Sequence, residues 1–310
     1  MTVRGSIIDA IGSTPLIELS RIHRGPGRIF AKAEFLNPGG SMKDRAALQI
    51  VRDAEAGGRL AAGQTVVEMT SGNMGAGLAV VCAASGHPFV AVMSRGNSAA
   101  RRVQMEALGA EVVLVDQVDG VPGRVTGSDI AAAVERAKEI TKERGGFYVD
   151  QFNNASGVRA HETGTGAEIW EQTGGQLDAF VCVVGTGATL VGVGRFLRSQ
   201  SDRVKIYAVE PAKSRPLAGF AVESPQHVLQ GTSYGRIPPH FAGFRADGHL
   251  AVTDDEALRC QRDLGRLEGI FVGPSSAANV CAAAKLAASG ELGVAPTIVT
   301  LLCDTGLKYV

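Results

Sequence analysis

The sequence has no excess of charge of either sign and no long apolar run. It contains 31 basic and 31 acidic residues, so its formal net charge is zero. Balanced charge without runs of one sign gives no basis for binding nucleic acid or an anionic membrane. No apolar stretch is long enough to span a bilayer, and residues Met1–Ser6 lack the apolar core of a signal peptide. We therefore expect a cytoplasmic protein with neither a membrane nor a nucleic-acid partner.

Cysteine is also sparse. The five cysteines are odd in number, scattered, and mostly within apolar segments: Cys82, Cys182, Cys260, Cys281 and Cys303. This pattern predicts reduced, buried thiols and not a disulfide framework. The pair His161-Glu162 is followed by Thr165 where a zinc-binding helix needs its second histidine, so we expect no metal site.

What the chain does have is an alternation of strand-like and helix-like segments. With 310 residues, 45% of them hydrophobic, it can form about two domains with ample cores. Strands are predicted at 28–36, 65–69, 88–93, 111–115, 147–149, 179–184, 204–209, 270–272 and 297–302. Helices are predicted from Lys43 to Gly57, at 76–85, 99–108, 130–144, around 168–170, and at 190–198, 255–267 and 277–288. Continuous apolar strands are typical of parallel sheets covered on both faces. Residues 116–128 and 211–248 are left as loop candidates.

Lys43 lies at an unusual place for a lysine. In the segment Asn37–Arg45, Pro38 and the pair Gly39-Gly40 end a strand-like run, and an amphipathic helix follows Lys43. A cation at a helix N-terminus meets the positive end of the helix dipole, which is structurally unfavourable. The same field favours the neutral amine, whose lone pair can attack a carbonyl. A solvated loop lysine is the alternative interpretation.

Two glycine-containing segments follow predicted strands and open predicted helices. They are Thr70-Ser71-Gly72-Asn73-Met74-Gly75 and Gly185-Thr186-Gly187-Ala188-Thr189. Open α/β sheets bind ligands at this edge, and hydroxyls and glycines at a helix N-terminus suit a carboxylate or a phosphate. For the first segment, an ordinary helix start capped by serine or asparagine is the alternative.

A dinucleotide-binding fold is the competing interpretation of the second segment. Glu210 ends the next predicted strand, where a ribose-binding carboxylate would lie. The third glycine of the dinucleotide fingerprint should stand at position 190, which is Leu190. The spacing therefore favours a cup for a single phosphate.

A third segment of this kind is Gly273-Pro274-Ser275-Ser276-Ala277-Ala278, for which a serine N-cap is the simplest explanation when it is taken alone. Together the segments supply a lysine, two anion cradles and a hydroxyl, all at strand-to-helix turns. This set suits an aldehyde cofactor with one phosphate, and pyridoxal 5'-phosphate is the natural candidate.

From Ile11-Gly12-Ser13-Thr14-Pro15-Leu16 to the final strand, these motifs resemble the cysteine synthase and cystathionine β-synthase family of fold-type II pyridoxal-phosphate enzymes. The resemblance implies a tryptophan synthase β-like α/β fold, with two open, twisted, mostly parallel sheets flanked by helices and the cofactor in an interdomain cleft. It assigns residues 1–40 and 155–310 to a larger domain that binds the cofactor phosphate, and 41–154 to a smaller mobile domain. Such relatives are usually homodimers.

The resemblance also implies roles for single residues. Lys43 matches the catalytic lysine that forms a Schiff base with the cofactor, Asn73 matches the asparagine at the ring oxygen, and Ser275 matches the serine that faces the pyridine nitrogen. The phosphate cup is expected at Gly185, Thr186, Gly187, Ala188 and Thr189, with Ala188 in place of a usual glycine. Substrate contacts are expected from Thr70, Ser71, Gly72, Met74, Tyr234 and Gln151, the last of which matches a glutamine that helps to hold the substrate carboxylate.

The implied reaction is β-replacement on an activated L-serine, such as O-acetylserine, with sulfide or a thiol as nucleophile. Lys43 would take the Cα proton as general base. A neutral hydroxyl at Ser275 suits elimination more than transamination, because it does not strongly hold a proton on the ring nitrogen. The alternatives are a cystathionine β-synthase-like or other specialised synthase of β-substituted alanines, a serine or threonine dehydratase, and a non-catalytic protein that kept the fold.

Two positions depart from plain cysteine synthases. Met74 stands where those enzymes usually carry a threonine that grips the substrate, and Tyr234 stands where cystathionine β-synthases have a tyrosine. Met74 cannot donate a hydrogen bond and brings flexible apolar surface. Either both residues merely fill space, or the preferred pair of substrates is not simply O-acetylserine and sulfide, and the nucleophile is a larger thiol such as homocysteine or another small molecule.

Overall fold

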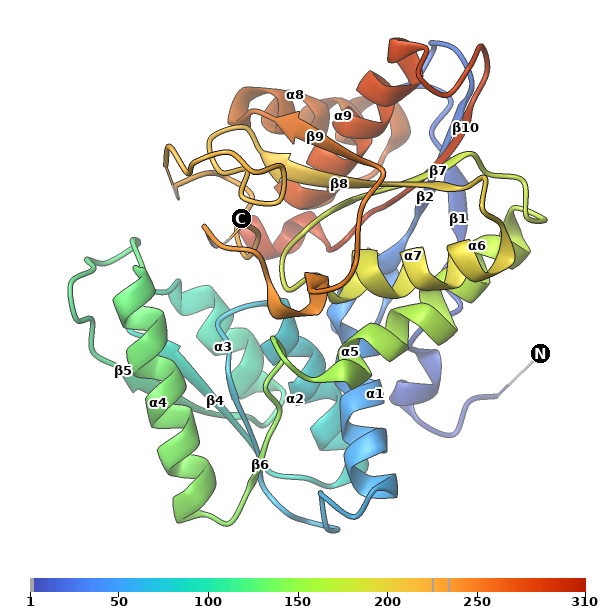
Figure 1. The fold of residues 1–310 in the computed structure, drawn as a ribbon. Coiled ribbons are helices and arrows are strands. Elements are labelled where there is room, and N and C mark those ends of the chain that lie inside the picture. Colours follow the sequence, from blue (N-terminus) through green and yellow to red (C-terminus); the bar gives the residue numbers. More distant parts are fainter. Residues whose placement is uncertain (1–2, 225, 234) are drawn as a thin grey trace. The chain divides into compact units, whose positions relative to one another are not determined.

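The computed structural model describes residues 3–224, 226–233 and 235–310, and the chain forms two compact units. Unit 1 contains the residues up to Ile11 and Asn37–Gly157, and unit 2 contains Gly12–Leu36 and Val158–Val310. Each unit has its own sheet (Figure 1). The division predicted from the family, 1–40 with 155–310 and 41–154 alone, differs from these units mainly in the residues up to Ile11, and it stays a prediction.

The sheet of unit 1 is entirely parallel, with the strand order β5-β4-β3-β6. Its strands are β3 (Val66–Met69), β4 (Phe89–Ser94), β5 (Glu111–Val115) and β6 (Phe147–Tyr148). Parallel neighbours need crossover connections, and these contain α2 (Asn73–Ser85), α3 (Ala99–Ala107) and α4 (Gly127–Glu143), while α1 (Lys43–Ala56) precedes β3.

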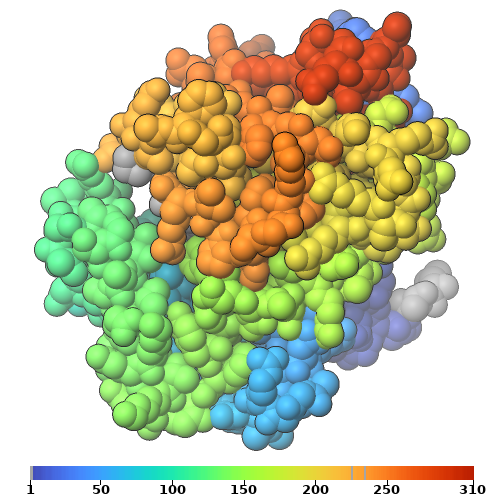
Figure 2. Space-filling view, viewed as in Figure 1, coloured from blue at the N-terminus to red at the C-terminus, as the bar shows by residue number. Residues whose placement is uncertain are grey.

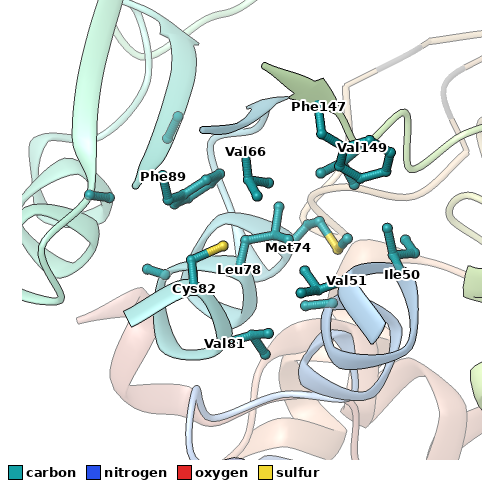
Figure 3. Packing of buried hydrophobic residues seen from close by; sticks show 14 of the residues in the cluster. Ile50, Val51, Val66, Met74, Leu78, Val81, Cys82, Phe89, Phe147 and Val149 are labelled. Atoms are coloured by element: carbon teal, nitrogen blue, oxygen red, sulfur yellow. The ribbon is translucent and has the colours of Figure 1, made fainter. Parts of the chain in front are cut away.

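Successive side chains of β3 enter two different cores. Val66 packs with α1 and α2, whereas Val67 packs with α4, where it meets Ala137 and its neighbours. Figure 3 shows the first core, in which Met74 and Leu78 of α2 lie close to Val66 and Met74 extends toward Ile50 of α1. The other face of α4 lies on the surface of the unit, within the green region of Figure 2. Burial on both faces explains why these strands are almost continuously apolar.

The sheet of unit 2 has the order β1-β2-β10-β7-β8-β9, and β1 is its one antiparallel strand. The strands are β1 (Leu16–Glu18), β2 (Arg28–Lys32), β7 (Ala179–Val183), β8 (Lys205–Pro211), β9 (Gly248–Val252) and β10 (Thr297–Leu301). Helices α8 (Asp254–Asp263) and α9 (Pro274–Ser289) cover one face, and α7 (Ala188–Gln200), next to α6 (Ala167–Gln172), covers the other (Figure 1).

The remaining helical elements are short. Helix α5 (Ala155–Ala160) crosses the unit boundary and continues into the π-helical segment His161–Gly166, and α8 continues into a second π-helical segment, Leu264–Glu268. Four 3-10 helices complete the described elements: Ile7–Ala10, Glu34–Leu36, Pro239–Phe241 and Gly306–Tyr309. No helix in the described ranges combines the length and apolarity that a membrane span requires.

The predicted α/β class with mostly parallel sheets flanked by helices is confirmed. The predicted strand Ile270–Val272 is wrong: α9 follows at once, and Val272 forms only an isolated antiparallel bridge with Thr305. Strands β1 and β9 were not predicted, because both are half-exposed strands at the edges of the sheet and lack a continuous apolar run.

Candidate active site

The segments singled out in the sequence all lie at the first turns of helices. Helix α1 begins at Lys43, α2 at Asn73, α7 at Ala188 and α9 at Pro274. The N-cap residues of the last three are Gly72, Gly187 and Gly273, none of which has a side chain that could cap the helix. The alternative of a serine or asparagine N-cap is therefore wrong for α2 and α9. A glycine N-cap leaves N–H groups of the first turn and the positive end of the helix dipole open to an anion, although in α2 Thr70 Oγ1 accepts one of them, the N–H of Gly75.

Asp44 fixes the loop that carries Lys43. Its buried carboxylate accepts hydrogen bonds from the backbone N–H of Gly39 and from Ser41 Oγ at 3.5 Å. The Lys43 N–H donates to Ser41 Oγ at 3.2 Å, and the Lys43 residue as a whole is half-buried. Gly40 adopts a left-handed conformation, with φ at 75°, so a glycine suits this turn. The first residue of α1 is thus held on a rigid loop.

The loop before α2 is held from both sides. Thr70 Oγ1 accepts the N–H of Gly75 at 3.0 Å, which folds the loop back on its own strand end. Arg101 of α3 donates to the backbone oxygen of Ser71 at 2.9 Å. Asn73 is half-buried at the first helical position. The hydroxyls, the amide and the helix start are therefore present at one end of the parallel sheet, as predicted.

Gln151 lies beside the end of β3. Its Nε2 donates to Glu68 Oε1 at 3.0 Å and approaches the backbone oxygen of Met69 at 3.4 Å. Glu68 is 1% exposed, and its Oε2 has no hydrogen-bond partner among the described residues. Burial raises the pKa of Glu68 to about 8, which the hydrogen bond from Gln151 opposes and the charge of Asp150 reinforces. At neutral pH this buried side chain is therefore largely a neutral acid.

Met74 lies in the hydrophobic core of unit 1. Its side chain is 2% exposed and packs with Leu78 and Ile50 (Figure 3). This placement supports the packing interpretation of the residue over a substrate contact. Tyr234, the other departure from plain cysteine synthases, lies outside the described residues.

The loop Gly185–Thr189 has the backbone geometry of an anion cradle. Gly187 is left-handed, with φ at 88°, and a Cβ added at Gly185 would lie 2.6 Å from the backbone oxygen of Gly231. Both positions therefore require glycine. Thr186 and Thr189 are each 5% exposed, so their hydroxyls stand in a place from which water is largely excluded. Backbone N–H groups, two hydroxyls and no acidic side chain make a donor set that fits a phosphate dianion.

Ser275 is the second residue of α9 and is 7% exposed. One turn later, Asn279 Oδ1 accepts the N–H of Val183 at 2.6 Å and its Nδ2 donates to the oxygen of Leu301. These bonds attach the first turns of α9 to the carboxyl ends of β7 and β10, and β7 ends shortly before Gly185. Unit 2 therefore brings the serine and the glycine loop to the same edge of its sheet.

Glu210 holds the segment that follows β8 in place. Its carboxylate accepts the backbone N–H groups of Leu217 at 2.8 Å and Ala218 at 3.1 Å, and the residue is 1% exposed. Because both oxygens fasten the chain after β8, the side chain is not presented to a ribose. This observation removes the remaining support for a dinucleotide site.

The sequence interpretation missed two buried titratable residues near these loops. Glu68 stands within an apolar strand, where a charged residue could have been noticed. His161 was considered only as part of a zinc motif, yet its Nε2 lies 3.2 Å from Thr189 Oγ1. Neither contact partner is close in the sequence, so spacing alone could not have paired them.

Comparison with known proteins identifies the family of the chain. A family model described as pyridoxal-phosphate dependent enzyme matches residues 7–304. A cysteine synthase of Staphylococcus aureus is 39% identical, over 98% of this chain and 94% of its own length. A hydrogen sulfide-producing enzyme from Fusobacterium nucleatum superposes with a TM-score of 0.91 at 34% identity, over 100% of this chain and 99% of that one. An O-ureido-L-serine synthase superposes with a TM-score of 0.89 at 37% identity, over 99% of this chain and 94% of that one.

These matches confirm the resemblance stated from the motifs, together with the fold-type II class and the pyridoxal 5'-phosphate cofactor. The chain belongs to the family of pyridoxal-phosphate-dependent enzymes, in the group that contains the cysteine synthases.

Proposed function

We propose that Lys43 and the two glycine-containing loops carry out β-replacement on an activated L-serine, with O-acetylserine as donor and sulfide or a thiol as nucleophile. The proposal is supported by the names of the relatives, which include cysteine synthase and, among the solved structures, O-acetylserine sulfhydrylase. The observation that carries the residue assignment is the start of α1, where half-buried Lys43 is held by the loop that Asp44 fixes. Bound pyridoxal phosphate supplies an aldehyde for amino groups and an electron sink for the carbanion.

The residues of this chain divide the binding work. In unit 2, Gly185–Thr189 would hold the phosphate through N–H groups and two hydroxyls, and the resemblance assigns Ser275 to the ring nitrogen as a neutral hydroxyl. In unit 1, the resemblance assigns Thr70–Gly72 and Gln151 to the substrate carboxylate and Asn73 to the ring oxygen. The Lys43 amine moves the proton at the substrate Cα, as a general base positioned by the loop before α1.

The assignment of Lys43 can be tested chemically. Borohydride reduction of the cofactor-loaded protein, followed by peptide mapping, should leave the cofactor on Lys43. Lys142→Ala, a change at an exposed lysine in the last turn of α4, is the control that should leave the labelled peptide unchanged. Label on Lys32, which is 0% exposed and paired with Glu168, or on any other lysine would refute the assignment.

The choice of donor and nucleophile needs its own measurement. O-Acetylserine, O-phosphoserine, serine and cysteine should be compared as donors, each with sulfide, thiosulfate, homocysteine and hydroxyurea-like acceptors. Since Met74 is buried in the core, we expect O-acetylserine with sulfide to give the highest kcat/KM. A preference for homocysteine or a urea-type acceptor would place the enzyme with the specialised synthases, and keto-acid release without a nucleophile would indicate a dehydratase.

We further propose a cytoplasmic homodimer in which 1–40 with 155–310 form the larger, phosphate-binding domain and 41–154 the smaller, mobile one. These statements come from the family resemblance. Light scattering of the eluted protein tests the dimer, and a monomeric mass at micromolar concentration would contradict it. Hydrogen exchange with and without donor tests the domains: added donor should slow exchange mainly in residues 41–154.

A further inference from the structure

A buried acid lies beside the glutamine that the proposed function assigns to the substrate carboxylate. Glu68, on β3, is 1% exposed, and its Oε1 accepts a hydrogen bond from Gln151 Nε2 at 3.0 Å. Its Oε2 has no hydrogen-bond partner among the residues that the structure describes. A buried negative charge is costly unless it is paired and hydrogen-bonded. The surroundings therefore suit a neutral acid, which accepts from the amide without carrying a charge.

The groups around Glu68 also oppose a negative charge on it. Because side chains alternate along a strand, Glu68 points to the same side of the sheet as Val66, toward the apolar core of α1 and α2. Burial raises the pKa of Glu68 to about 8, and the negative charge of Asp150 adds to this effect. Burial also raises the pKa of Tyr148 to about 13, so its hydroxyl stays neutral. No cation in the described parts of the chain forms an ion pair with Glu68.

The turn that carries Gln151 is fixed by its own backbone. Asp150 adopts a left-handed conformation, with φ at 51°, and its carbonyl oxygen accepts the N–H groups of Asn153 at 3.0 Å and Asn154 at 2.9 Å. A residue other than glycine in this conformation is strained and persists only where the surrounding structure holds it. The side chain of Gln151 therefore starts from a defined place, and its hydrogen bond to Glu68 sets the direction in which the amide faces.

The two N–H bonds of Gln151 Nε2 point to different acceptors. One donates to Glu68 Oε1, and the other lies on the side of the Met69 backbone oxygen, at the longer distance of 3.4 Å. Met69 directly precedes Thr70–Gly72, the loop assigned to the same substrate carboxylate. A carboxylate that accepts the second N–H would lie about 5 Å from Glu68 Oε1, because both acceptors lie about 3 Å from one nitrogen. Two negative charges this close in a buried site repel each other strongly, so the carboxylate requires a neutral Glu68.

We propose that Glu68 is a positioning residue that acts as a neutral acid: its Oε1 holds one N–H of Gln151 so that the other faces the substrate carboxylate, and its proton must be in place for the donor to bind. The proposal rests on the proposed function, in that it takes Gln151 and Thr70–Gly72 to hold that carboxylate. Binding of the donor and protonation of Glu68 are then coupled, and each favours the other.

The first test observes Glu68 itself in the cofactor-loaded enzyme. Carbon-13 spectra of protein labelled at the glutamate side-chain carboxyl, with Glu68 assigned by its absence in Glu68→Gln, should show a carboxyl that titrates near pH 8. L-Alanine has the amino and carboxylate groups of the donor and no leaving group. At saturation it should raise the midpoint by about one pH unit or more, which corresponds to at least tenfold weaker L-alanine binding when Glu68 is ionised. A midpoint near the ordinary 4.5, or one that L-alanine does not move, would overturn the proposal.

The second test separates positioning from packing with two substitutions. Glu68→Gln keeps an oxygen that accepts from Gln151 and cannot ionise, whereas Glu68→Met has a similar length and no such acceptor. At pH 7, Glu68→Met should weaken L-alanine binding roughly three- to tenfold, the effect of one lost neutral hydrogen bond, while Glu68→Gln stays within about twofold of the parent. Glu68→Gln should also lack the loss of affinity that ionisation of Glu68 causes in the parent above about pH 8. Equal losses in both variants, with equal losses of folding stability, would show a packing role alone and overturn the proposal.

A double-variant cycle distinguishes this proposal from the function on which it rests. Gln151→Ala should weaken L-alanine binding roughly tenfold to a hundredfold, because a hydrogen bond to a charged group is lost. Adding Glu68→Met to Gln151→Ala should weaken it no further, since the amide that Glu68 holds is gone. If Gln151→Ala weakens binding and Glu68→Met does not, the positioning role is wrong and the carboxylate contact stands. If Gln151→Ala leaves L-alanine affinity unchanged, the contact itself is misplaced, and the positioning role falls with that part of the proposed function.

Discussion

Helices in this chain start in two ways. Helices α4 and α8 begin with capping boxes, in which Thr126 and Thr253 accept an N–H from the third helical residue, Asp129 or Glu256, and that acid accepts the threonine N–H in return. Helices α2 and α7 begin with Gly72 and Gly187, which have no side chain for this purpose.

The difference separates helix starts whose first N–H groups are bonded within a capping box from the helix starts that we propose to face a ligand. A capping box uses up N–H groups within the chain and stabilises the helix. A glycine N-cap leaves the positive end of the helix dipole more accessible to an anion, although Thr70 Oγ1 already accepts the N–H of Gly75 in α2, and the helix is then stabilised when the anion binds. We propose that the starts of α2 and α7 bind ligands at some expense of stability in the apo-protein, whereas the starts of α4 and α8 contribute to stability alone.

The acidic residues next to the two kinds of helix start also differ, in the direction in which their pKa values are shifted. Asp129, in the box of α4, receives the N–H of Thr126 and of Val118, and these bonds hold its pKa well below its ordinary value. Glu68, in the strand before α2, has one unpartnered oxygen, and burial raises its pKa to about 8. One acid is stable as an anion and the other as a neutral group.

The largest expected effect is therefore a pH dependence. The folded protein keeps the Glu68 proton up to about pH 8, whereas the unfolded chain releases it near the ordinary pKa of 4.5. The free energy of unfolding should thus fall as pH rises from 5 to 8, by roughly 4 kcal/mol at most from this group. Glu68→Gln can still accept from Gln151 but cannot ionise. Urea unfolding of the apo-protein at several pH values should show that, in this variant, the free energy of unfolding no longer falls by this amount between pH 5 and 8.

Asp129→Asn is the control for this experiment. A carboxyl whose folded pKa is depressed contributes stability that is present above its ordinary pKa of 3.8 and is lost only as pH falls below it. Between pH 5 and 8, Asp129→Asn should lower the free energy of unfolding by a constant amount and leave the slope unchanged. Equal slopes in the parent and in Glu68→Gln would show that Glu68 is already ionised at pH 5.

The next largest effect is expected on cofactor binding, when a glycine of each loop is replaced by alanine. A Cβ at Gly185 would lie 2.6 Å from the backbone oxygen of Gly231, which cannot move without shifting the loop. A Cβ at Gly72 would lie 3.3 Å from Arg101 Nη1, the end of a flexible side chain. Gly185→Ala should weaken cofactor binding at least a hundredfold, since more than one bond to the phosphate is displaced. Gly72→Ala should change it less than about threefold, and equal losses would place the phosphate at both loops or at neither.

Met74→Thr should have a smaller effect, on stability and not on specificity. Replacing a 2% exposed side chain in the core of unit 1 removes apolar contacts and buries a hydroxyl, at a cost of about 2 kcal/mol in unfolding free energy. Met74→Leu, which keeps the volume, should cost less than about 1.5 kcal/mol. The ranking of donors and nucleophiles by kcat/KM should be the same in both variants. A changed ranking in Met74→Thr would show that Met74 contacts the substrate.

The sequence predicted the sheets and the loops better than the starts of the helices. Apolar strands such as Val66–Met69 and the spacing of Gly185 and Gly187 are local patterns. Helix α2 was predicted from Ala76 but begins at Asn73, because apolar periodicity starts only where the helix meets the core. The roles of Glu68 and His161 depend on partners far along the chain, and only the fold brings these partners together.

The smallest effect should come from the capped helices, where a substitution ought to cost stability and nothing else. Thr126→Ala or Thr253→Ala removes the oxygen that accepts the N–H of Asp129 at 3.3 Å or of Glu256 at 3.2 Å, at a cost of about 1 kcal/mol in urea unfolding. Serine at either position keeps the acceptor and should restore most of the loss. Cofactor affinity should stay at the parent value in all four variants, in contrast to Thr189→Ala, which should lose roughly tenfold to a hundredfold in affinity with little change in the stability of the apo-protein. If Thr126→Ala or Thr253→Ala weakened cofactor binding as much as Thr189→Ala does, the two kinds of helix start would not differ in function.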